Sequence, residues 1–492
     1  MRISILRLSL GVAALAAAAT LSSCERKSEG VVQVMVIGGQ PRLVEPREGP
    51  LSAGDAVLVD NVAQGLVRFD ARGQVEPGLA EAWNVSDDGL SYIFRLANGN
   101  WPNGRKITAD QVARMLRRTL ASSSQDPLKD SFGAVDEIVA MTDRVLDIEL
   151  KQPRPHLLQL LAQPEMGLVF EGQGTGPFAI DKEHSRNGLV RLSREIATPD
   201  EELTSKEVLD ISSATAEPAI AAFAQGKIDL LLGGTFDDLP FAQRASLPRR
   251  TLQFDPASGL FGLIPANNRG LIADPEVRQL LSAAIDRDSL LSTLSVPGLT
   301  PRATVLEPGL DNIVDPVPPA WASTAVGARQ AALASTAKRL FGGKDVSLRI
   351  ALPAGPGGDI LFARLAQDWA VLGLRLNRVG SGDAADLKLV DAVAPTTSPS
   401  WFLRHFRCAA VPICSPQIDE MLESARNTPV IAQRSALFAE ASRQIDAQQL
   451  FIPIAAPIRW SLVSTRISGF AGNRFAIHTL TGLEQQLNRT GE

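Results

Sequence analysis

The stretch from Gly78 to Leu120 constrains the fold most, because each of its parts specifies a local structure. A polar turn at 86–89 precedes residues 91–96, in which every second residue is large and apolar, a pattern typical of a strand with one buried face. After a second turn, Thr108 predicts a helix N-cap, and Gln111 three residues later predicts a capping box. The predicted helix carries an apolar stripe at helical spacing, formed by Val112, Met115, Leu116 and Leu120. No residue of this stretch indicates catalysis.

The N-terminus has the pattern of an export signal. Arg2 and Arg7 precede an apolar run from Leu8 to Ala19, which is too short to span a bilayer. It ends in Leu21-Ser22-Ser23-Cys24, which resembles the bacterial lipobox and implies cleavage before Cys24 with a diacylglycerol group on its sulfur. The alternative is simple secretion with Cys24 incidental, and the spacing favours the lipoprotein. Residues 1–23 are then a signal peptide, and residues 24–30 a polar tether.

Composition narrows the class of protein. The chain of 492 residues is 45% hydrophobic and 21% charged, which is typical of soluble globular proteins with two or three lobes. Removing Arg2 and Arg7 with the signal peptide changes the formal net charge from −5 to −7. No basic stripe indicates a nucleic-acid partner, and no later apolar run has transmembrane length. We expect a monomeric domain outside the cytoplasm, in the periplasm of a bacterial envelope, held to the membrane through its lipid alone.

Two further cysteines, Cys408 and Cys414, are separated by five residues. An oxidising compartment favours a disulfide over two buried thiols. Closing so short a loop would stabilise the fold by about 2 kcal/mol in the chain-entropy description. The four histidines are scattered and there is no C-x-x-C, so we expect neither a metal site nor a cofactor.

The second half of the chain has the alternation of an α/β protein. A second lobe is expected to begin near Asp274. This residue predicts a helix N-cap, with Pro275 at the first helical position. Strand and helix patterns then alternate, at Val346–Leu352, Ile360–Leu372, Leu374–Val379 and Leu387–Val390.

No motif indicates an enzyme. The glycines at 355–358 lack the third glycine of a dinucleotide-binding loop, because Ile360 occupies that position, and we expect a structural loop with Asp359 as a helix cap. The pair Asp237-Asp238 is interpreted as a turn rather than an acid–base dyad. There is no G-x-S-x-G and no H-E-x-x-H.

Four segments together resemble one protein family. GLAEAWNVSDDG with PNGRKITADQV, between Gly78 and Val112, resembles the signature of the family 5 extracellular solute-binding proteins of bacterial ABC importers, the peptide-, nickel- and opine-binding class. GTGPF at 174–178, AFAQGKIDLL at 222–231 and DPEVRQLLSAAIDRDSLL at 274–291 follow in the family's order.

The resemblance implies a periplasmic-binding-protein-like clam-shell of type II, with two lobes and an extra domain inserted in the first. The lobes would be joined by two crossings, near Ile264 and near Trp460. Ligand would lie in the cleft and favour closure, which the permease recognises. The expected divisions are 31–66, 172–264 and 461–492 for the core of lobe I, 67–171 for the extra domain and 265–460 for lobe II.

Specificity is where the chain departs from the family. In its peptide binders an Asp in an A-D-Y-x-x-P-x-x-F-L-like passage holds the peptide ammonium, and here VDAVAPTTSPSWFL places Pro395 at that position. Either the loop is re-spaced and Asp391 serves, or the amine anchor is absent, and we favour absence. The few histidines argue against nickel or haem ligation. The expected ligand-binding residues are Asp391, Trp401, Arg404, Arg407, Arg459 and Trp460.

The resemblance implies a receptor that delivers a peptide or peptide-like small solute to the permease subunits of an ABC importer. The alternative is a sensor or chaperone-like binding protein on the same fold, without a role in transport.

Overall fold

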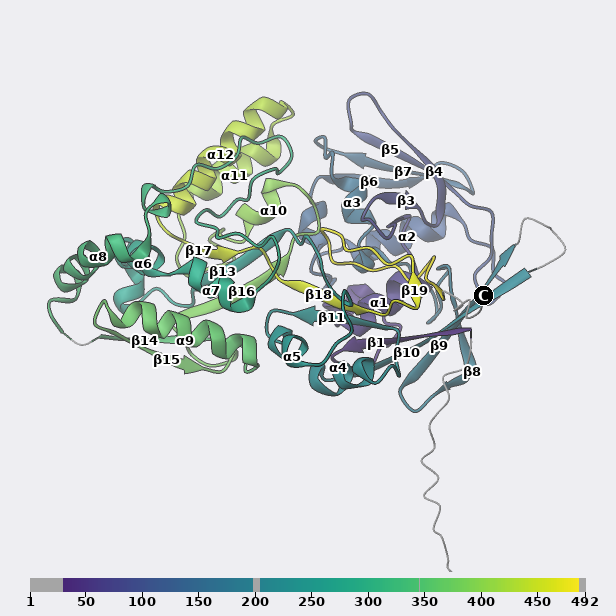
Figure 1. Ribbon diagram of the computed structural model, residues 1–492. Coiled ribbons are helices and arrows are strands. Elements are labelled where there is room, and N and C mark those ends of the chain that lie inside the picture. The colour runs from purple at the N-terminus through teal and green to yellow at the C-terminus, as the bar shows by residue number, and fades with distance from the viewer. Residues whose placement is uncertain (1–29, 198–203, 345, 486–492) are drawn as a thin grey trace, which may run out of the picture.

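Strand β1 (Val31–Ile37) begins the first lobe and lies inside its sheet, where it pairs in parallel with strands on both sides. The computed structural model describes residues 30–197, 204–344 and 346–485. Cys24, the expected lipidation site, lies outside these ranges. The sheet of lobe I has the strand order β12-β18-β11-β1-β10-β9-β8 (Figure 1). Its other strands are β8 (Ala179–Arg186), β9 (Leu189–Ala197), β10 (Thr204–Ala214), β11 (Leu230–Thr235), β12 (Leu252–Phe254) and β18 (Arg459–Val463).

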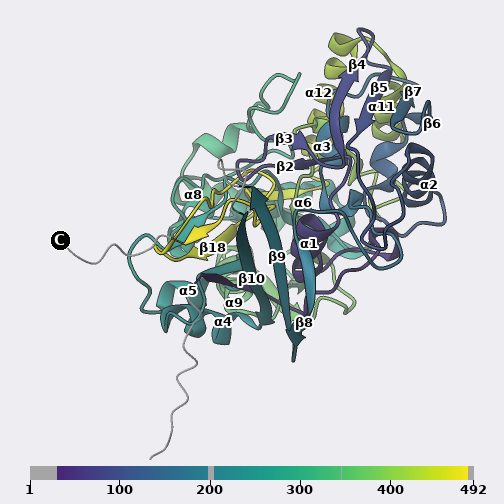
Figure 2. The same ribbon diagram turned by 90° about the vertical axis from the view of Figure 1, so that its right-hand side faces the viewer.

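The extra domain is built on a four-stranded antiparallel sheet of order β4-β5-β7-β6. Figure 2 shows these strands above the strands of lobe I. The strands are β4 (Ala80–Val85), β5 (Ser91–Leu96), β6 (Val135–Ala140) and β7 (Val145–Leu150), and a ribbon of β2 (Val67–Phe69) and β3 (Val75–Pro77) precedes them. Helices α2 (Ala109–Thr119) and α3 (Leu157–Leu161) and the 3-10 turns η2 (Lys129–Phe132) and η3 (Pro164–Met166) complete the domain.

Lobe II has a five-stranded mixed sheet of order β15-β14-β16-β13-β17. The strands are β13 (Gly259–Pro265), β14 (Val346–Ala351), β15 (Leu374–Val379), β16 (Leu387–Val393) and β17 (Ile452–Ala455). Its helices are α6 (Pro275–Ala284), α7 (Arg287–Leu294), α8 (Val326–Phe341), α9 (Pro356–Ala370), α10 (Pro399–Arg404), α11 (Pro416–Asn427) and α12 (Ile431–Ala447).

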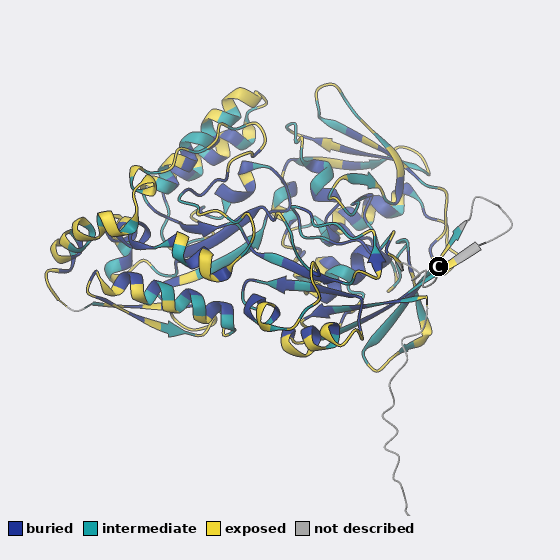
Figure 3. Cartoon of the chain, viewed as in Figure 1, coloured by how far each residue is buried: buried dark blue, intermediate teal, exposed yellow. Residues whose placement is uncertain are grey.

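The remaining elements belong to lobe I or to short connections. They are α1 (Ala53–Val62), α4 (Ala216–Ala224), α5 (Leu239–Arg244), β19 (Ile467–Ser468), β20 (Glu484–Gln485) and the 3-10 turns Pro46–Glu48, Gly270–Ala273 and Ala320–Ser323. Figure 3 shows that buried residues follow the sheets and the inward faces of the helices, with exposed residues outside. Within the described ranges, none of the helices combines the length and the apolar content that a bilayer crossing requires.

The chain passes between the two large sheets at 255–258, from β12 to β13, and at 456–458, from β17 to β18. The first crossing lies earlier than the position near Ile264 inferred from the sequence, because Gly259–Pro265 pairs with β16 along its whole length. Trp460 lies just beyond the second crossing, in lobe I, where β18 pairs with β11.

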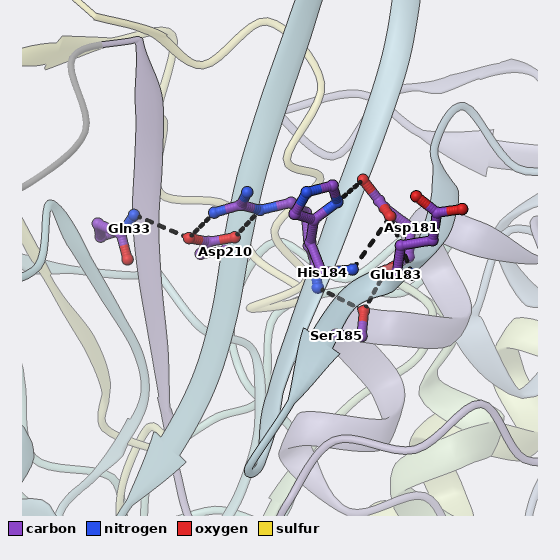
Figure 4. Close-up of polar contacts among 7 residues, drawn as sticks. Gln33, Asp181, Glu183, His184, Ser185 and Asp210 are labelled. Carbon is purple, nitrogen blue, oxygen red and sulfur yellow. Dashed lines mark hydrogen bonds and ion pairs between the residues drawn. The ribbon is translucent and has the colours of Figure 1, made fainter.

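The edge of the lobe I sheet is held by charged side chains. Arg191 on β9 donates from Nε and Nη2 to the two carboxylate oxygens of Asp210 on β10, at 2.7 Å each. Gln33 on β1 donates to the same carboxylate at 3.1 Å, and His184 Nδ1 lies 2.8 Å from Asp181 Oδ2 on β8 (Figure 4). The contacts of Asp210 link β9, β10 and β1, while the contact between His184 and Asp181 lies within β8.

Most of the local structure expected between Gly78 and Leu120 is present. β5 alternates buried and exposed side chains, and Thr108 caps α2 by accepting from the Gln111 amide at 3.3 Å. The capping-box prediction is wrong in its second half. The Gln111 side chain instead accepts from Nε1 of Trp101 at 2.8 Å, because that indole is buried and its N–H needs an acceptor.

Replacing the cap of α2 should weaken the extra domain. We expect Thr108→Ala to lower the free energy of unfolding by about 1 kcal/mol, because the Gln111 amide loses its acceptor, while Thr108→Ser retains most of it. Urea denaturation followed by tryptophan fluorescence checks this, and equal stability of the Ala and Ser variants would contradict it.

Stability should also depend on pH through Asp446 on α12. Its carboxylate accepts from the Val305 amide at 2.8 Å, and burial raises its pKa to about 7. Between about pH 4 and 7 the folded state therefore binds more protons than the unfolded state, so stability falls as the pH rises. We expect Asp446→Asn to make this decline shallower, as measured by urea denaturation across the range. The surface variant Asp136→Asn is the control. If the free energy of unfolding of Asp446→Asn declined with pH as steeply as that of the wild type, the interpretation would be contradicted.

A candidate binding cavity between the lobes

A cavity of about 160 Å³ lies between the extra domain and lobe II. The extra domain contributes residues of 130–134 and 154–160 to its wall, and lobe II contributes residues of 311–312 and of 396–407 together with parts of α11 and α12. Figure 1 shows α10 between the α11–α12 pair and the extra domain. The wall therefore comes from both sides of the interlobe boundary.

The passage that contains α10 brings three of the expected ligand-binding residues to this cavity. Ser398 caps the helix by accepting from the Ser400 amide at 3.3 Å. Trp401, Arg404 and Arg407 line the cavity, and Arg404 donates to the Ser131 hydroxyl of the extra domain. The following loop is closed by a disulfide, which joins Cys408 to Cys414.

Pro395 faces the extra domain through its backbone. Its carbonyl accepts from Gln163 Nε2 at 2.7 Å, and the nearby Thr397 amide donates to Gln159 Oε1 at 3.0 Å. Proline offers no carboxylate here, so this position contributes nothing to the binding of an ammonium group beyond a carbonyl that is already occupied.

Asp391, Arg459 and Trp460 lie at the crossings and not in the wall of this cavity. Nη1 of Arg459, on β18, donates to both carboxylate oxygens of Asp391, on β16, at 2.8 and 3.0 Å. Burial raises the pKa of Asp391, and the Arg459 charge opposes that rise. Trp460 is buried and donates to the Thr235 carbonyl at 2.7 Å. The Asp391 carboxylate is thus paired, and binding a ligand amine there would compete with Arg459.

The glycine-rich loop before α9 has a structural role that depends on the other lobe. Asp237 follows β11 of lobe I, and its carboxylate accepts from the amides of Gly355 at 3.1 Å and Gly358 at 2.8 Å. The Gly357 amide donates to the Asp237 carbonyl at 2.9 Å. A Cβ at Gly357 would lie 2.1 Å from the Phe236 carbonyl oxygen, so glycine is required for this approach.

Asp237 therefore caps α9 from across the interlobe boundary, a role that sequence reasoning missed. The helix begins at Pro356 after an N-cap at Gly355, so Asp359 is not its cap, and Asp359 pairs with Arg378 instead. An acidic group near a helix N-terminus is stabilising. The only sequence signal was an aspartate in one segment and a glycine run more than a hundred residues later.

The cavity wall is rich in arginine. Arg404 and Arg407 were expected from the sequence, while Arg154, Arg426 and Arg434 were not. Burial, together with the neighbouring charges of Arg434 and Arg426, lowers the pKa of Arg154 to about 10. Burial also lowers the pKa of His156, whose Nε2 lies 3.4 Å from Asp311 Oδ2. Arg426 and Arg434 follow the pattern of solvated helix faces, so no local signal could have assigned them to this wall.

Among the residues that the structure describes, no three His, Cys, Asp or Glu side chains gather in a way that could hold a metal ion.

Known proteins share this architecture. The chain is 26% identical over 463 residues to di/tripeptide-binding protein 2 of Pseudomonas aeruginosa, covering 80% of this chain and 84% of the relative. The fold matches that of the Escherichia coli murein tripeptide binding protein MppA with a TM-score of 0.77, at 18% identity, over 92% of this chain and 98% of the other. An unliganded open form of MppA gives 0.67, at 17% identity, over 92% and 96%.

The two-lobed type II fold expected from the sequence is confirmed by these structural neighbours. The resemblance that carried that expectation is confirmed as well. Because residues 74–391, well over half of the chain, match the family model "Bacterial extracellular solute-binding proteins, family 5 Middle", this chain belongs to family 5 of these proteins, which bind solutes and are not enzymes.

Proposed function

We propose that this protein is a lipid-anchored receptor of the bacterial cell envelope, which captures a peptide-like small solute between its lobes and delivers it to an ABC-type permease. The observation that carries the proposal is the cavity between the extra domain and lobe II, whose wall both sides build. Family membership and the di/tripeptide-binding relative support the choice of solute class. The lipobox-like sequence before Cys24 supports the anchor.

Hydrogen bonds across the cavity give the solute a way to influence closure. Arg154 of the extra domain donates to the Arg426 carbonyl at 2.8 Å, and Arg434 of lobe II donates to the Pro153 carbonyl at 3.1 Å. A solute that contacts both sides binds the closed arrangement better than the open one, and this difference in affinity is what shifts the equilibrium.

The six expected ligand-binding residues divide into two groups in this proposal. Trp401, Arg404 and Arg407 contact the solute, because they line the cavity. Asp391, Arg459 and Trp460 act near the crossings, where the Arg459–Asp391 contact links β18 of lobe I to β16 of lobe II and Trp460 links β18 to β11 within lobe I. In this proposal no residue takes the role of the aspartate that holds the peptide ammonium group in the family's peptide binders.

Binding and uptake can be tested together. We expect the protein lacking residues 1–23 to bind di- or tripeptides in calorimetry, and a strain without the gene to lose uptake of the same compounds. Trp401→Ala should weaken binding at least about tenfold, because a buried aromatic wall is lost. Trp83→Ala, in the extra-domain sheet, is the matched control. Normal uptake without the gene would favour the sensor or chaperone-like alternative, and absence of any binding would refute the receptor.

The capping of α9 by Asp237, across the interlobe boundary, offers a second test. We expect Asp237→Ala to weaken solute binding about fivefold, because losing a cap worth about 1 kcal/mol destabilises the closed arrangement. The radius of gyration from X-ray scattering should increase at the same time. Asp238→Ala is the control, since that carboxylate accepts from Thr235 within its own lobe. Unchanged affinity and size for Asp237→Ala would show that this contact does not help closure.

A further inference from the structure

The cavity wall holds more positive than negative charge. Its five arginines face three carboxylates, those of Asp130, Asp311 and Glu423, which leaves an excess of two positive charges. Among the described residues, Arg426 is the only one of the five arginines with a carboxylate within ion-pair distance, Glu423 at 3.9 Å. Asp311 is engaged with the Thr397 hydroxyl and His156.

Several sheltered arginines outside the cavity have close carboxylate partners, whereas the buried Arg278 and Arg287 donate only to backbone carbonyls and a serine hydroxyl. The nitrogen–oxygen distance is 2.7 Å in Arg191–Asp210, 2.6 Å in Arg302–Glu307 and 2.8 Å in Arg459–Asp391. In the cavity wall, Arg154 and Arg434 donate to neutral groups, the carbonyls of Pro153, Arg426 and Thr428. Positive groups brought together without partners repel one another unless an anion joins them.

Two of these guanidinium groups keep unused donors. The Nε atoms of Arg407 and Arg434 are buried and have no hydrogen-bond partner within the described part of the chain. The Arg407 guanidinium, in addition, forms no ion pair or hydrogen bond with any residue in those ranges. Buried donors normally have partners, so these two atoms point to an acceptor that comes from outside the chain.

The rest of the wall suits an organic solute. Leu157, Leu160, Trp401, Leu422 and Phe438 add apolar surface beside the arginines. The volume of about 160 Å³ is below the range usual for pockets that hold drug-sized ligands, and it suits a small molecule. Guanidinium groups bind carboxylates in a planar, bidentate geometry.

We propose that this cavity selects a small organic anion with an apolar body, whose carboxylate is held by arginines of the extra domain and of lobe II, and that the solute needs no ammonium group. The inference rests on the proposed function and names the solute class for that site. Arg154 approaches from the extra domain, and Arg407 and Arg434 from lobe II. A carboxylate among them supplies the missing acceptor and joins the two sides.

Three probes that share the alanyl-leucine skeleton but differ in their terminal charges test which charged group the cavity binds. At pH 7.5 alanyl-leucine is a zwitterion, its N-acetyl form is an anion and its C-terminal amide is a cation. We expect calorimetry to show the N-acetyl form binding at least as tightly as the free dipeptide, and the amide at least about tenfold more weakly, because a hydrogen-bonded charge pair is lost. Equal or tighter binding of the amide would overturn the inference and leave the proposed function intact.

Variants of the arginines identify the site. Arg407→Gln and Arg434→Gln should each weaken binding of the N-acetyl probe at least about tenfold. Arg443→Gln is the matched control, since Arg443 lies on α12 as Arg434 does but pairs with Glu440 at the surface, and it should stay within about twofold. The melting temperature of ligand-free Arg407→Gln should be unchanged or higher, because repulsion is relieved.

Two other outcomes would count against the inference. Wild-type affinity of both arginine variants for the N-acetyl probe would overturn it, and so would a marked loss of melting temperature in ligand-free Arg407→Gln, which would indicate a structural role. If none of the three probes binds while the strain without the gene still loses uptake of peptides, only the solute class is wrong. If uptake is also normal, the proposed function fails as well.

Discussion

In the described part of the chain the two lobes are joined by two short crossings, and this constraint governs the rest of the structure. Each crossing connects a strand of one sheet directly to a strand of the other, at 255–258 and at 456–458. Every further contact between the lobes is non-covalent and can break and re-form. The pair Arg459–Asp391 lies at this junction and links β18 to β16 by charge as well as by chain connectivity. In the proposed receptor, closure would therefore depend on weak contacts distributed on both sides of the crossings.

Elements that short-range rules specify could be predicted from the sequence. Asp274 with Pro275 starts α6 as expected, and Thr108 starts α2. In both cases the acceptor and the amide it binds lie within three residues, so the pattern contains the whole interaction. The overall fold was accessible for a different reason, because the ordered segments between Gly78 and Leu291 matched a known family.

The remaining features depend on partners that are distant in the sequence. Gln111 accepts from a buried indole instead of closing a capping box, and Asp237 caps a helix that begins more than a hundred residues later. The arginines of the cavity wall come from two domains, so no single segment contains their pattern. A local sequence pattern cannot show which distant group competes for a donor or acceptor. This explains why Trp401, Arg404 and Arg407 could be named from the family's passage, while Arg154, Arg426 and Arg434 of the same cavity wall could not.

The position of β1 determines which lobe would be held close to the membrane. Seven residues from Cys24 to Gly30 precede β1 in the sequence, and even fully extended they reach only about 25 Å. With a lipid on Cys24, lobe I would be confined to a thin layer above the bilayer. Lobe II would then be the lobe that moves relative to the membrane. The receptor would then meet its permease in a search over two dimensions, already restricted in orientation before any solute is captured.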